Sequence, residues 1–292
     1  MHGLDKAGPP SADAAKRMLD KIGGSWWHVY IGGPRASVAW KPSHVEAYRA
    51  KGIKHFLLDY VGRQSEDVHL LTVGQGQRDG EEAVQLAGTF GFGAGEPLCL
   101  DLEQRTFNAA QDASLDYVEG WCATVRQLGW RPGVYTNVAP LKALAKRTEK
   151  PDWVFVARWV RDGPDPAMDP RQIKDLPDDL WAGRRVWQYA GEIDENILGE
   201  VVDVDVTDIT FGCLTGTSPG AALLKAASSL TEEDDMFTFT TAGKPVFFVA
   251  GGKAVGLNSA NDLVAIKRAV PGLPEFKLDP ETFDAFLRVY RA

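Results

Sequence analysis

Carboxylates close three of the short apolar segments of this sequence, and their spacing suits acid catalysis on a sugar. They are Asp5, the pair Asp101 and Glu103, and the pair Asp203 and Asp205. Side chains alternate faces along a strand, so the members of each pair point the same way. Clustered carboxylates raise one another's pKa, which makes a proton donor available near neutral pH. Cleavage of a glycosidic bond needs such a donor, and also an ionised carboxylate that stabilises the positive charge developing on the sugar.

Each of these carboxylates also has a structural interpretation, in which it caps a helix or pairs with an Arg. For any single residue the two interpretations carry about equal weight. The coincidence of three strand ends favours a common site.

Aromatic and amide side chains close the other apolar segments. They are Tyr30, Tyr60, Tyr135, Asn137, Trp159, Trp187, Gln188 and Tyr189. An aromatic face with hydrogen-bonding groups beside it suits a sugar ring, which is apolar on its faces and polar at its rim. Core packing is the alternative, and we assign Trp187 to it. The residues predicted to bind substrate are Tyr30, Tyr60, Tyr135, Asn137, Trp159, Gln188 and Asp205.

Short apolar segments that alternate with helical patterns must position these side chains. Strands are predicted over His2–Asp5, His28–Gly33, His55–Val61, Leu98–Glu103, Gly133–Asn137, Trp153–Trp159, Arg185–Tyr189 and Val201–Val206. Helices are predicted over 11–22, 43–50, 81–90, 112–128, 138–147, 176–181 and 221–228.

This alternation indicates parallel strands joined by crossover helices. An open doubly wound sheet would give a similar pattern, but eight units within about 215 residues favour closure into a (β/α)₈ barrel. Catalytic groups of such barrels project from the carboxyl ends of the strands, where the carboxylates above are expected to meet.

The pattern changes after Gly212, and we predict three parts: a barrel over 1–214, a linker with a helix over 215–235, and a small α+β module over 236–292. Phe237–Thr241, Val246–Ala250 and Ala254–Leu257 are predicted to form a β-meander, followed by helices over 261–269 and 280–289. This module is expected to bind cell wall or to mediate self-association.

Composition excludes several classes of function. The net charge of −8 and the lack of a basic stripe disfavour nucleic acid as a partner. The five histidines show no metal-ligand spacing, so neither a metal nor another cofactor is expected. Three cysteines cannot build a disulfide framework, and no signal peptide or membrane-spanning apolar run is visible. Synthesis in the cytoplasm is therefore expected.

Several short motifs, in this order and at this spacing, resemble the glycoside-hydrolase-like proteins of domain of unknown function 1906 and the family 25 lysozymes of phages and bacteria. The opening Gly3–Asp5 with Ser11 and Val29–Pro34 resembles the first family. The series 101–103, 133–137, 157–159, 186–189 and 202–205 resembles both. The resemblance covers about residues 2–212.

The resemblance implies roles for four carboxylates. Glu103 matches the general acid, and Asp101 matches the carboxylate that stabilises the transition state or orients the substrate's N-acetyl group. Asp5 matches the carboxylate of the first strand and Asp203 that of the last. Asp205 stands where the lysozymes usually carry Asn, so the choice between Asp203 and Asp205 stays open.

Two classes of function follow. The first is a peptidoglycan glycosidase of the endolysin or phage-tail kind, which acts at the bacterial cell wall after assisted export or as part of a virion. The second is a non-catalytic barrel that binds wall glycan or serves as a structural virion protein.

Overall fold

The computed structural model describes residues 1–38, 40–193 and 198–209, and the backbone of four strands beyond them. The chain divides into two compact units, residues 1–216 and 217–292.

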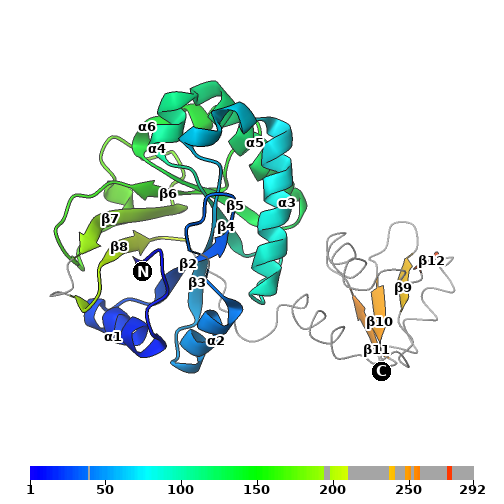
Figure 1. The fold of residues 1–292 in the computed structure, drawn as a ribbon, viewed down its shortest axis with the longest axis horizontal. Coiled ribbons are helices and arrows are strands. Elements are labelled where there is room, and N and C mark those ends of the chain that lie inside the picture. The colour runs from blue at the N-terminus through cyan, green and yellow to red at the C-terminus, as the bar shows by residue number, and fades with distance from the viewer. Residues whose placement is uncertain are drawn as a thin grey trace. The chain divides into compact units, whose positions relative to one another are not determined.

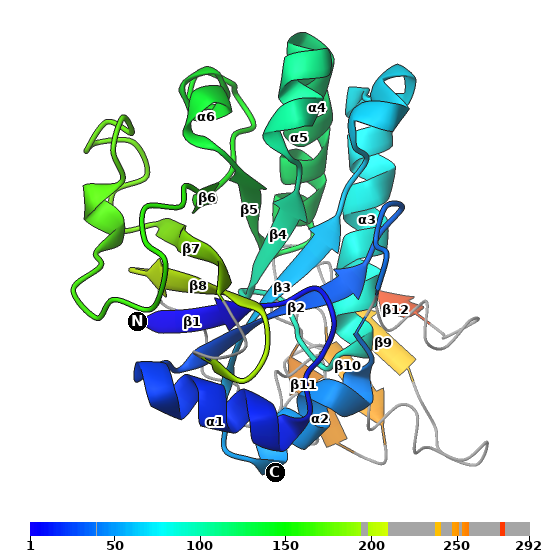
Figure 2. The ribbon, with the colours of Figure 1, turned by 60° about the vertical axis from the view of Figure 1, so that its left-hand side comes forward.

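Eight strands close into a barrel in the first unit, in the order of the chain (Figures 1 and 2). They are β1 (His2–Asp5), β2 (Trp26–Gly32), β3 (His55–Val61), β4 (Pro97–Asp101), β5 (Arg131–Thr136), β6 (Trp153–Ala157), β7 (Arg185–Ile193) and β8 (Val202–Thr207). The predicted eight-stranded closed barrel is confirmed.

The last strand corrects the predicted all-parallel topology. Strands β1 to β7 pair in parallel, whereas β8 is antiparallel to both β7 and β1. Only eight residues separate Ile193 from Val202, and a parallel crossover needs a dozen or more. The first residues of β8 therefore lie at the same end of the barrel as the last residues of β1.

Helices follow most of the parallel strands. They are α1 (Ala12–Ile22), α2 (Pro42–Ala50), α3 (Val73–Thr89), α4 (Gln104–Ala109), α5 (Gln111–Gln127) and α6 (Val138–Leu144), with 3₁₀ turns η1 (Ser65–Leu70) and η2 (Pro170–Gln172). Helix α1 begins and ends as predicted, because the Ser11 hydroxyl accepts from the Ala14 amide and Gly23 adopts the left-handed conformation. The helix predicted over 176–181 does not form; this segment consists of turns.

Helix α3 begins at Val73, eight residues before the predicted start, with Thr72 as its N-cap. The prediction took Asp79 as the cap and the residues before it as a long loop. Gly76 in that segment serves helix packing instead: a Cβ there would lie 2.1 Å from the Tyr117 carbonyl oxygen of α5. A Cβ at Gly120 of α5 would likewise lie 2.1 Å from the Val73 carbonyl oxygen. The missing side chains at these glycines therefore let the two helices, which are adjacent in Figure 2, approach closely.

Large aromatic rings fill the barrel interior at the end away from the carboxylates. The Trp26 ring lies against Gly3 and the Trp153 ring against Gly133, where a Cβ would in each case fall 2.1 Å from an indole atom. Both indoles are buried in a cluster with Leu57, Cys99, Phe155 and Val186. This end of the barrel interior is therefore a packed apolar core.

The second unit contains a four-stranded sheet in the order β11-β10-β9-β12. Its strands are β9 (Phe237–Thr240), β10 (Phe247–Ala250), β11 (Lys253–Gly256) and β12 (Glu275–Lys277). Strands β9, β10 and β11 pair antiparallel, and β12 joins β9 in parallel. The linker predicted over 215–235 and the helices predicted over 221–228, 261–269 and 280–289 lie outside the described residues.

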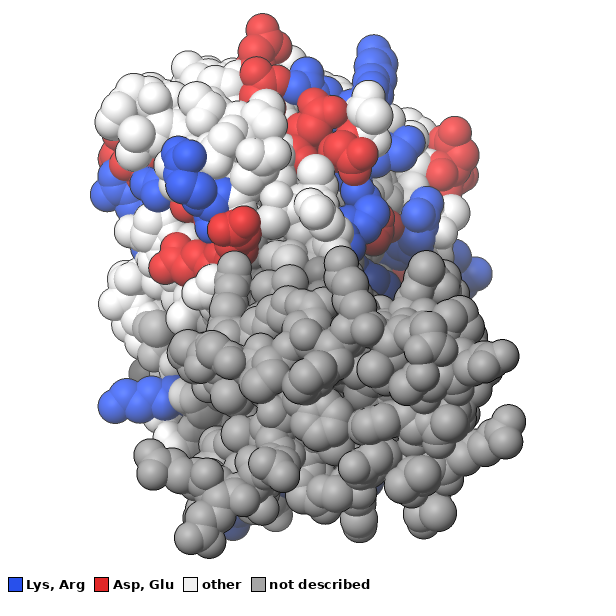
Figure 3. Space-filling model, turned by 90° about the vertical axis from the view of Figure 1, so that its right-hand side faces the viewer, with Lys and Arg blue, Asp and Glu red and all other residues white. Residues whose placement is uncertain are grey.

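Neither a membrane-spanning helix among the described residues nor a basic field on the described part of one face is seen. Within residues 1–209, apart from their short gaps, no helix combines the length and apolarity needed to cross a bilayer. Figure 3 shows acidic and basic side chains interspersed over the described part of one face. This mixture differs from the clustered basic residues that nucleic-acid binding requires.

Candidate active site

Three of the predicted carboxylates meet at one mouth of the barrel. Asp5 is the last residue of β1, and Asp101 is the last residue of β4. Asp203 lies near the start of the reversed strand β8 and pairs directly with Asp5 in the strand register. The antiparallel direction of β8 thus brings Asp203 level with the carboxyl ends of the other strands.

Gln188 on β7 connects this cluster to the surrounding aromatic residues. Its amide nitrogen donates to Asp5 Oδ2 at 3.2 Å and to Asp203 Oδ2 at 3.0 Å. Its amide oxygen accepts from the Tyr135 hydroxyl at 3.2 Å and from Trp159 Nε1 at 3.0 Å. Two donated and two accepted bonds use the full capacity of the amide. Gln188 is also buried, so it holds other site residues in place, which corrects its predicted direct contact with substrate.

His28 and Asp59 complete the polar interior, and sequence reasoning missed both. His28 on β2 places Nδ1 3.1 Å from Asp5 Oδ2 and Nε2 2.7 Å from Asp59 Oδ2. All three side chains are buried. Alternation could have found His28, which occupies the same face of its strand as the predicted site residue Tyr30. It gave no such signal for Asp59, whose neighbour Tyr60 was the predicted residue.

Burial and mutual repulsion favour the protonated form of several carboxyls. Burial, followed by the charge of Asp5, raises the pKa of Asp203 from 3.8 to about 7. Burial and then the charges of Asp59 and Glu103 raise the pKa of Asp101 well above its usual value. The mouth can therefore hold protons near neutral pH, as acid catalysis requires.

Asp205 lies deeper than Asp203 and does not reach the mouth. It is fully buried beside Gly3 in the strand register, and neither carboxylate oxygen has a hydrogen-bond partner among the described residues. Burial, followed by the charge of Asp5, raises the pKa of Asp205 well above its usual value. This placement corrects the expectation that Asp205 contacts substrate, and it makes Asp203 the carboxylate of β8 that borders the mouth.

Glu103 stands on the rim rather than inside the barrel. It is the residue before α4, its side chain is 46% exposed, and its Oε2 lies 2.8 Å from Arg105 Nε. An exposed pair of this kind contributes little stability, so a bound substrate can displace it.

Gln64, in the loop after β3, holds the segment that carries Asp101 and Glu103. Its side-chain nitrogen donates to the Asp101 carbonyl oxygen at 3.0 Å, and its oxygen accepts from the Glu103 amide at 3.2 Å. The Thr106 hydroxyl donates to the same oxygen at 2.8 Å. This buried residue therefore fixes the turn from β4 into α4.

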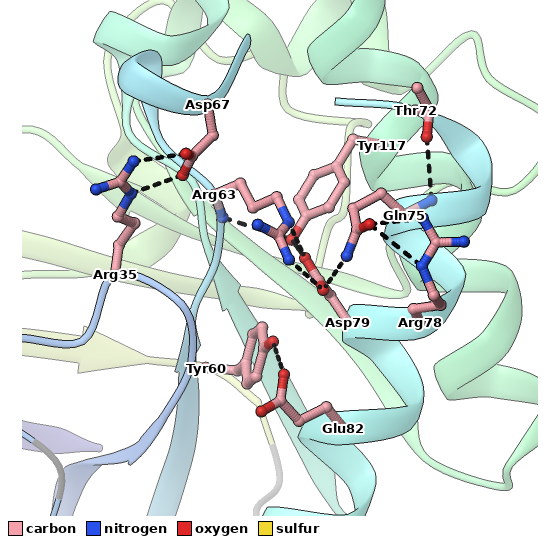
Figure 4. A network of polar contacts seen from close by, with 10 residues as sticks. All are labelled: Arg35, Tyr60, Arg63, Asp67, Thr72, Gln75, Arg78, Asp79, Glu82 and Tyr117. Atoms are coloured by element: carbon pink, nitrogen blue, oxygen red, sulfur yellow. Dashed lines mark hydrogen bonds and ion pairs between the residues drawn. The ribbon is translucent and has the colours of Figure 1, made fainter. Parts of the chain in front are cut away.

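The loop that carries Gln64 is braced by the network in Figure 4. Arg63 forms a bidentate pair with Asp79 of α3, at 2.9 and 3.2 Å, and the Tyr117 hydroxyl of α5 donates to the same carboxylate at 2.7 Å. Arg35 pairs with Asp67 of η1. These contacts fasten the loop to α3, α5 and the segment after β2.

The structure separates the predicted aromatic residues into two groups. Tyr30 donates to Asp5 Oδ2 at 3.2 Å, and Tyr135 contacts Gln188, so both lie at the site. Tyr60 does not: it points out of the barrel and donates to Glu82 of α3 at 2.6 Å (Figure 4). Its neighbour Asp59 faces inward, and strand alternation therefore places Tyr60 outside, which corrects its predicted role in substrate binding.

Trp159 presents an exposed aromatic face beside the mouth. The side chain is 53% exposed, although its N–H is bonded to Gln188. Its ring covers Gly191 of β7 so closely that a Cβ there would fall 2.0 Å from the indole. Asn137 supports the neighbouring loop by donating to the Ala157 carbonyl oxygen at 3.0 Å. Trp159 thus combines a fixed position with a free ring face.

Comparisons with known proteins agree with the fold. The family model for the Rv2525c-like, glycoside hydrolase-like domain matches residues 21–209. No curated protein matches the chain. The Tat-secreted protein Rv2525c of Mycobacterium tuberculosis is similar in structure, with a TM-score of 0.53 at 16% identity over 73% of this chain and 98% of that one.

Two further solved structures are similar at comparable identity. An uncharacterized protein of B. stearothermophilus has a TM-score of 0.51 at 18% identity, over 71% of this chain and 95% of that one. A glycosyl hydrolase 25 of Streptococcus pneumoniae has a TM-score of 0.49 at 15% identity, over 70% and 86%.

Proposed function

Since this chain belongs to the family of the Rv2525c-like, glycoside hydrolase-like domain, we propose that it hydrolyses the glycan strand of bacterial peptidoglycan by carboxylate acid catalysis. The observation that carries the proposal is the meeting of Asp5, Asp101 and Asp203 at one mouth of a closed barrel. The raised pKa of Asp203 supports it, because it shows that the mouth can hold a proton on a carboxyl near neutral pH.

In the proposed mechanism, Glu103 donates a proton to the glycosidic oxygen once substrate has separated it from Arg105. Its position on the rim leaves the carboxyl accessible to a bound glycan. Asp101 lies two residues away and stabilises the positive charge that develops on the sugar, or orients an N-acetyl group toward the anomeric carbon.

Asp203 and Asp5 have supporting roles in this proposal. Asp203, the more exposed of the two, binds a sugar hydroxyl and tunes the charge of the mouth. Asp5 is only 2% exposed, so its main effect on the reaction is electrostatic. The exposed ring of Trp159 supplies an apolar platform for one sugar face.

A second candidate is a barrel that binds wall glycan, or serves in a virion, without cleaving. Two observations favour it: the near-complete burial of Asp5 and the pairing of Glu103 with Arg105. In this alternative the carboxylates and Trp159 would hold glycan, and no bond would break.

Release of new reducing ends from purified peptidoglycan separates the two candidates. We expect release by the unaltered protein and by the control Glu81→Gln, which changes an exposed residue of α3, but not by Glu103→Gln. Equal release by all three would remove Glu103 as the acid. No release from any wall type, together with retention on the insoluble wall, would establish the binding function.

We also propose that the second unit is an accessory module for wall binding or self-association. Size-exclusion chromatography and wall sedimentation of the full chain and of a chain ending at Leu214 test this role. Unchanged oligomeric state and unchanged wall retention would contradict it.

A further inference from the structure

A row of three buried polar side chains crosses adjacent strands inside the barrel. Asp5 comes from β1, His28 from β2 and Asp59 from β3. Each is at most 2% exposed. The catalytic roles proposed above use Asp5 but leave His28 and Asp59 without a function.

The contacts of His28 are incompatible with a neutral imidazole between two ionised carboxylates. Both ring nitrogens face carboxylate oxygens, at 3.1 Å toward Asp5 and 2.7 Å toward Asp59. A neutral imidazole carries one N–H and no net charge, so it could face only one of the two carboxylates with a donor. An imidazolium presents an N–H on both sides. The contacts are close in distance but not aligned as hydrogen bonds, so their attraction comes mainly from charge.

The surroundings of His28 add negative charge and aromatic rings. Tyr30 of its own strand and Phe155 of β6 pack against the imidazole, with ring centroids 4.8 and 5.2 Å away. The titratable groups that face this interior from the other strands are Asp5, Asp59, Cys99, Asp101, Tyr135, Asp203 and Asp205. An imidazolium at this position offsets part of that repulsion.

We propose that His28 is a positioning residue: its imidazolium, held by Asp59, keeps Asp5 ionised and oriented beneath the mouth, so that the proton of the neighbouring pair Asp5 and Asp203 resides on Asp203. Electrostatics agrees with this geometry. Burial opposes the charged form of His28, but Asp5 and Asp59 together outweigh it and raise the pKa of His28 well above its usual value. The effect of His28 on the charge of Asp5 does not depend on the proposed function, whereas any benefit of that effect to catalysis rests on it.

Nitrogen-15 NMR of the full-length protein, labelled at histidine, tests the charge of His28 directly. His28→Gln assigns the signal by its loss, and His69→Gln, which changes an exposed histidine, is the matched control. We expect both ring nitrogens of His28 to stay protonated from pH 5 to 8, and His69→Gln to leave the His28 signals unchanged. A neutral imidazole at position 28 below pH 7 would overturn the proposal.

Asp59→Asn tests the source of the charge. Without the second carboxylate, the midpoint of the His28 titration should fall by at least about one pH unit. An unchanged midpoint in a folded variant would show that Asp59 does not hold the imidazolium. If Asp59→Asn does not fold, the titration of the unaltered protein still decides the charge of His28.

The pH dependence of kcat/KM separates this inference from the proposed function. If hydrolysis needs Asp5 held by the imidazolium, His28→Gln should lower kcat/KM and alter its pH profile, because Asp5 then loses its cationic neighbour. A charged His28 in a protein that cleaves no glycan would refute the hydrolase and leave the charge assignment intact. Hydrolysis with a neutral His28 would refute the positioning role.

Discussion

Trp159 donates its indole N–H to the side-chain oxygen of Gln188, 3.0 Å away. The same amide donates to Asp5 and Asp203, so the exposed aromatic face and the buried carboxylates are joined through one residue. A sugar stacked on Trp159 would therefore rest on the same framework that fixes the carboxylates.

Replacing Gln188 by Leu should destabilise the barrel strongly. The change takes one hydrogen bond from each of Asp5, Tyr135, Trp159 and Asp203. A buried group left unsatisfied costs about 1–3 kcal/mol. We expect a lower midpoint of urea unfolding and loss of any hydrolytic activity. The control is Gln85→Leu on the exposed face of α3, which should change the free energy of unfolding by no more than about 0.5 kcal/mol. Equal effects of the two changes would contradict the role given to Gln188.

Replacing Trp159 by Ala should weaken glycan binding and leave folding largely intact. An aromatic contact of about 0.7–1.4 kcal/mol corresponds to roughly a 3- to 10-fold rise in the Kd for a soluble wall fragment. Trp159→Phe keeps an aromatic face but loses the N–H, so it should retain most of the affinity. The Kd values can be measured by isothermal titration calorimetry. A Kd unaffected by Trp159→Ala would exclude this ring from the binding surface.

Asp203 should make the stability of the protein depend on pH. Its pKa is about 7 in the fold and 3.8 without the fold's influence. Between these values the folded state binds the additional proton, so the free energy of unfolding contributed by Asp203 falls as the pH rises from about 4 to 7. Asp203→Asn has no such titrating group. Its free energy of unfolding, compared with that of the unaltered protein, should therefore rise from pH 4.5 to pH 7.5.

Urea unfolding at the two pH values measures this difference, and any pH-independent loss of hydrogen bonds cancels in it. The matched control is Asp162→Asn, which changes an exposed carboxyl. A variant whose stability follows the same pH dependence as the unaltered protein would show that Asp203 keeps an ordinary proton affinity.

Gly133→Ala should be destabilising because of Trp153. The added Cβ would lie 2.1 Å from the indole, which cannot move within the packed interior. Overpacking of this kind costs about 1–3 kcal/mol. Gly88→Ala in α3 is the control, since nothing lies within 4 Å of its added Cβ, and it should stabilise the helix by up to about 1 kcal/mol. Thermal unfolding of the two variants should therefore give Tm shifts of opposite sign, and shifts of the same sign would contradict this account of the core.

The sequence by itself determined where the eight strands lie and that carboxylates stand at their ends. Apolar runs with the period of a strand are local signals, and the placement of Asp5 and Asp101 follows from them alone. The prediction of the outer helices was less complete. Glycines such as Gly74 and Gly76 occur both in loops and where helices pack closely, and the sequence alone does not distinguish the two.

Only the tertiary structure decided which way β8 runs and which side chains share the interior. Alternation has the same period in either strand direction, so it could not place Asp203 at the mouth and Asp205 below it. Nor could it bring His28 between Asp5 and Asp59, or turn Tyr60 toward Glu82. These relationships join residues far apart in the chain, and they exist only once the barrel has closed and fixed the register of neighbouring strands.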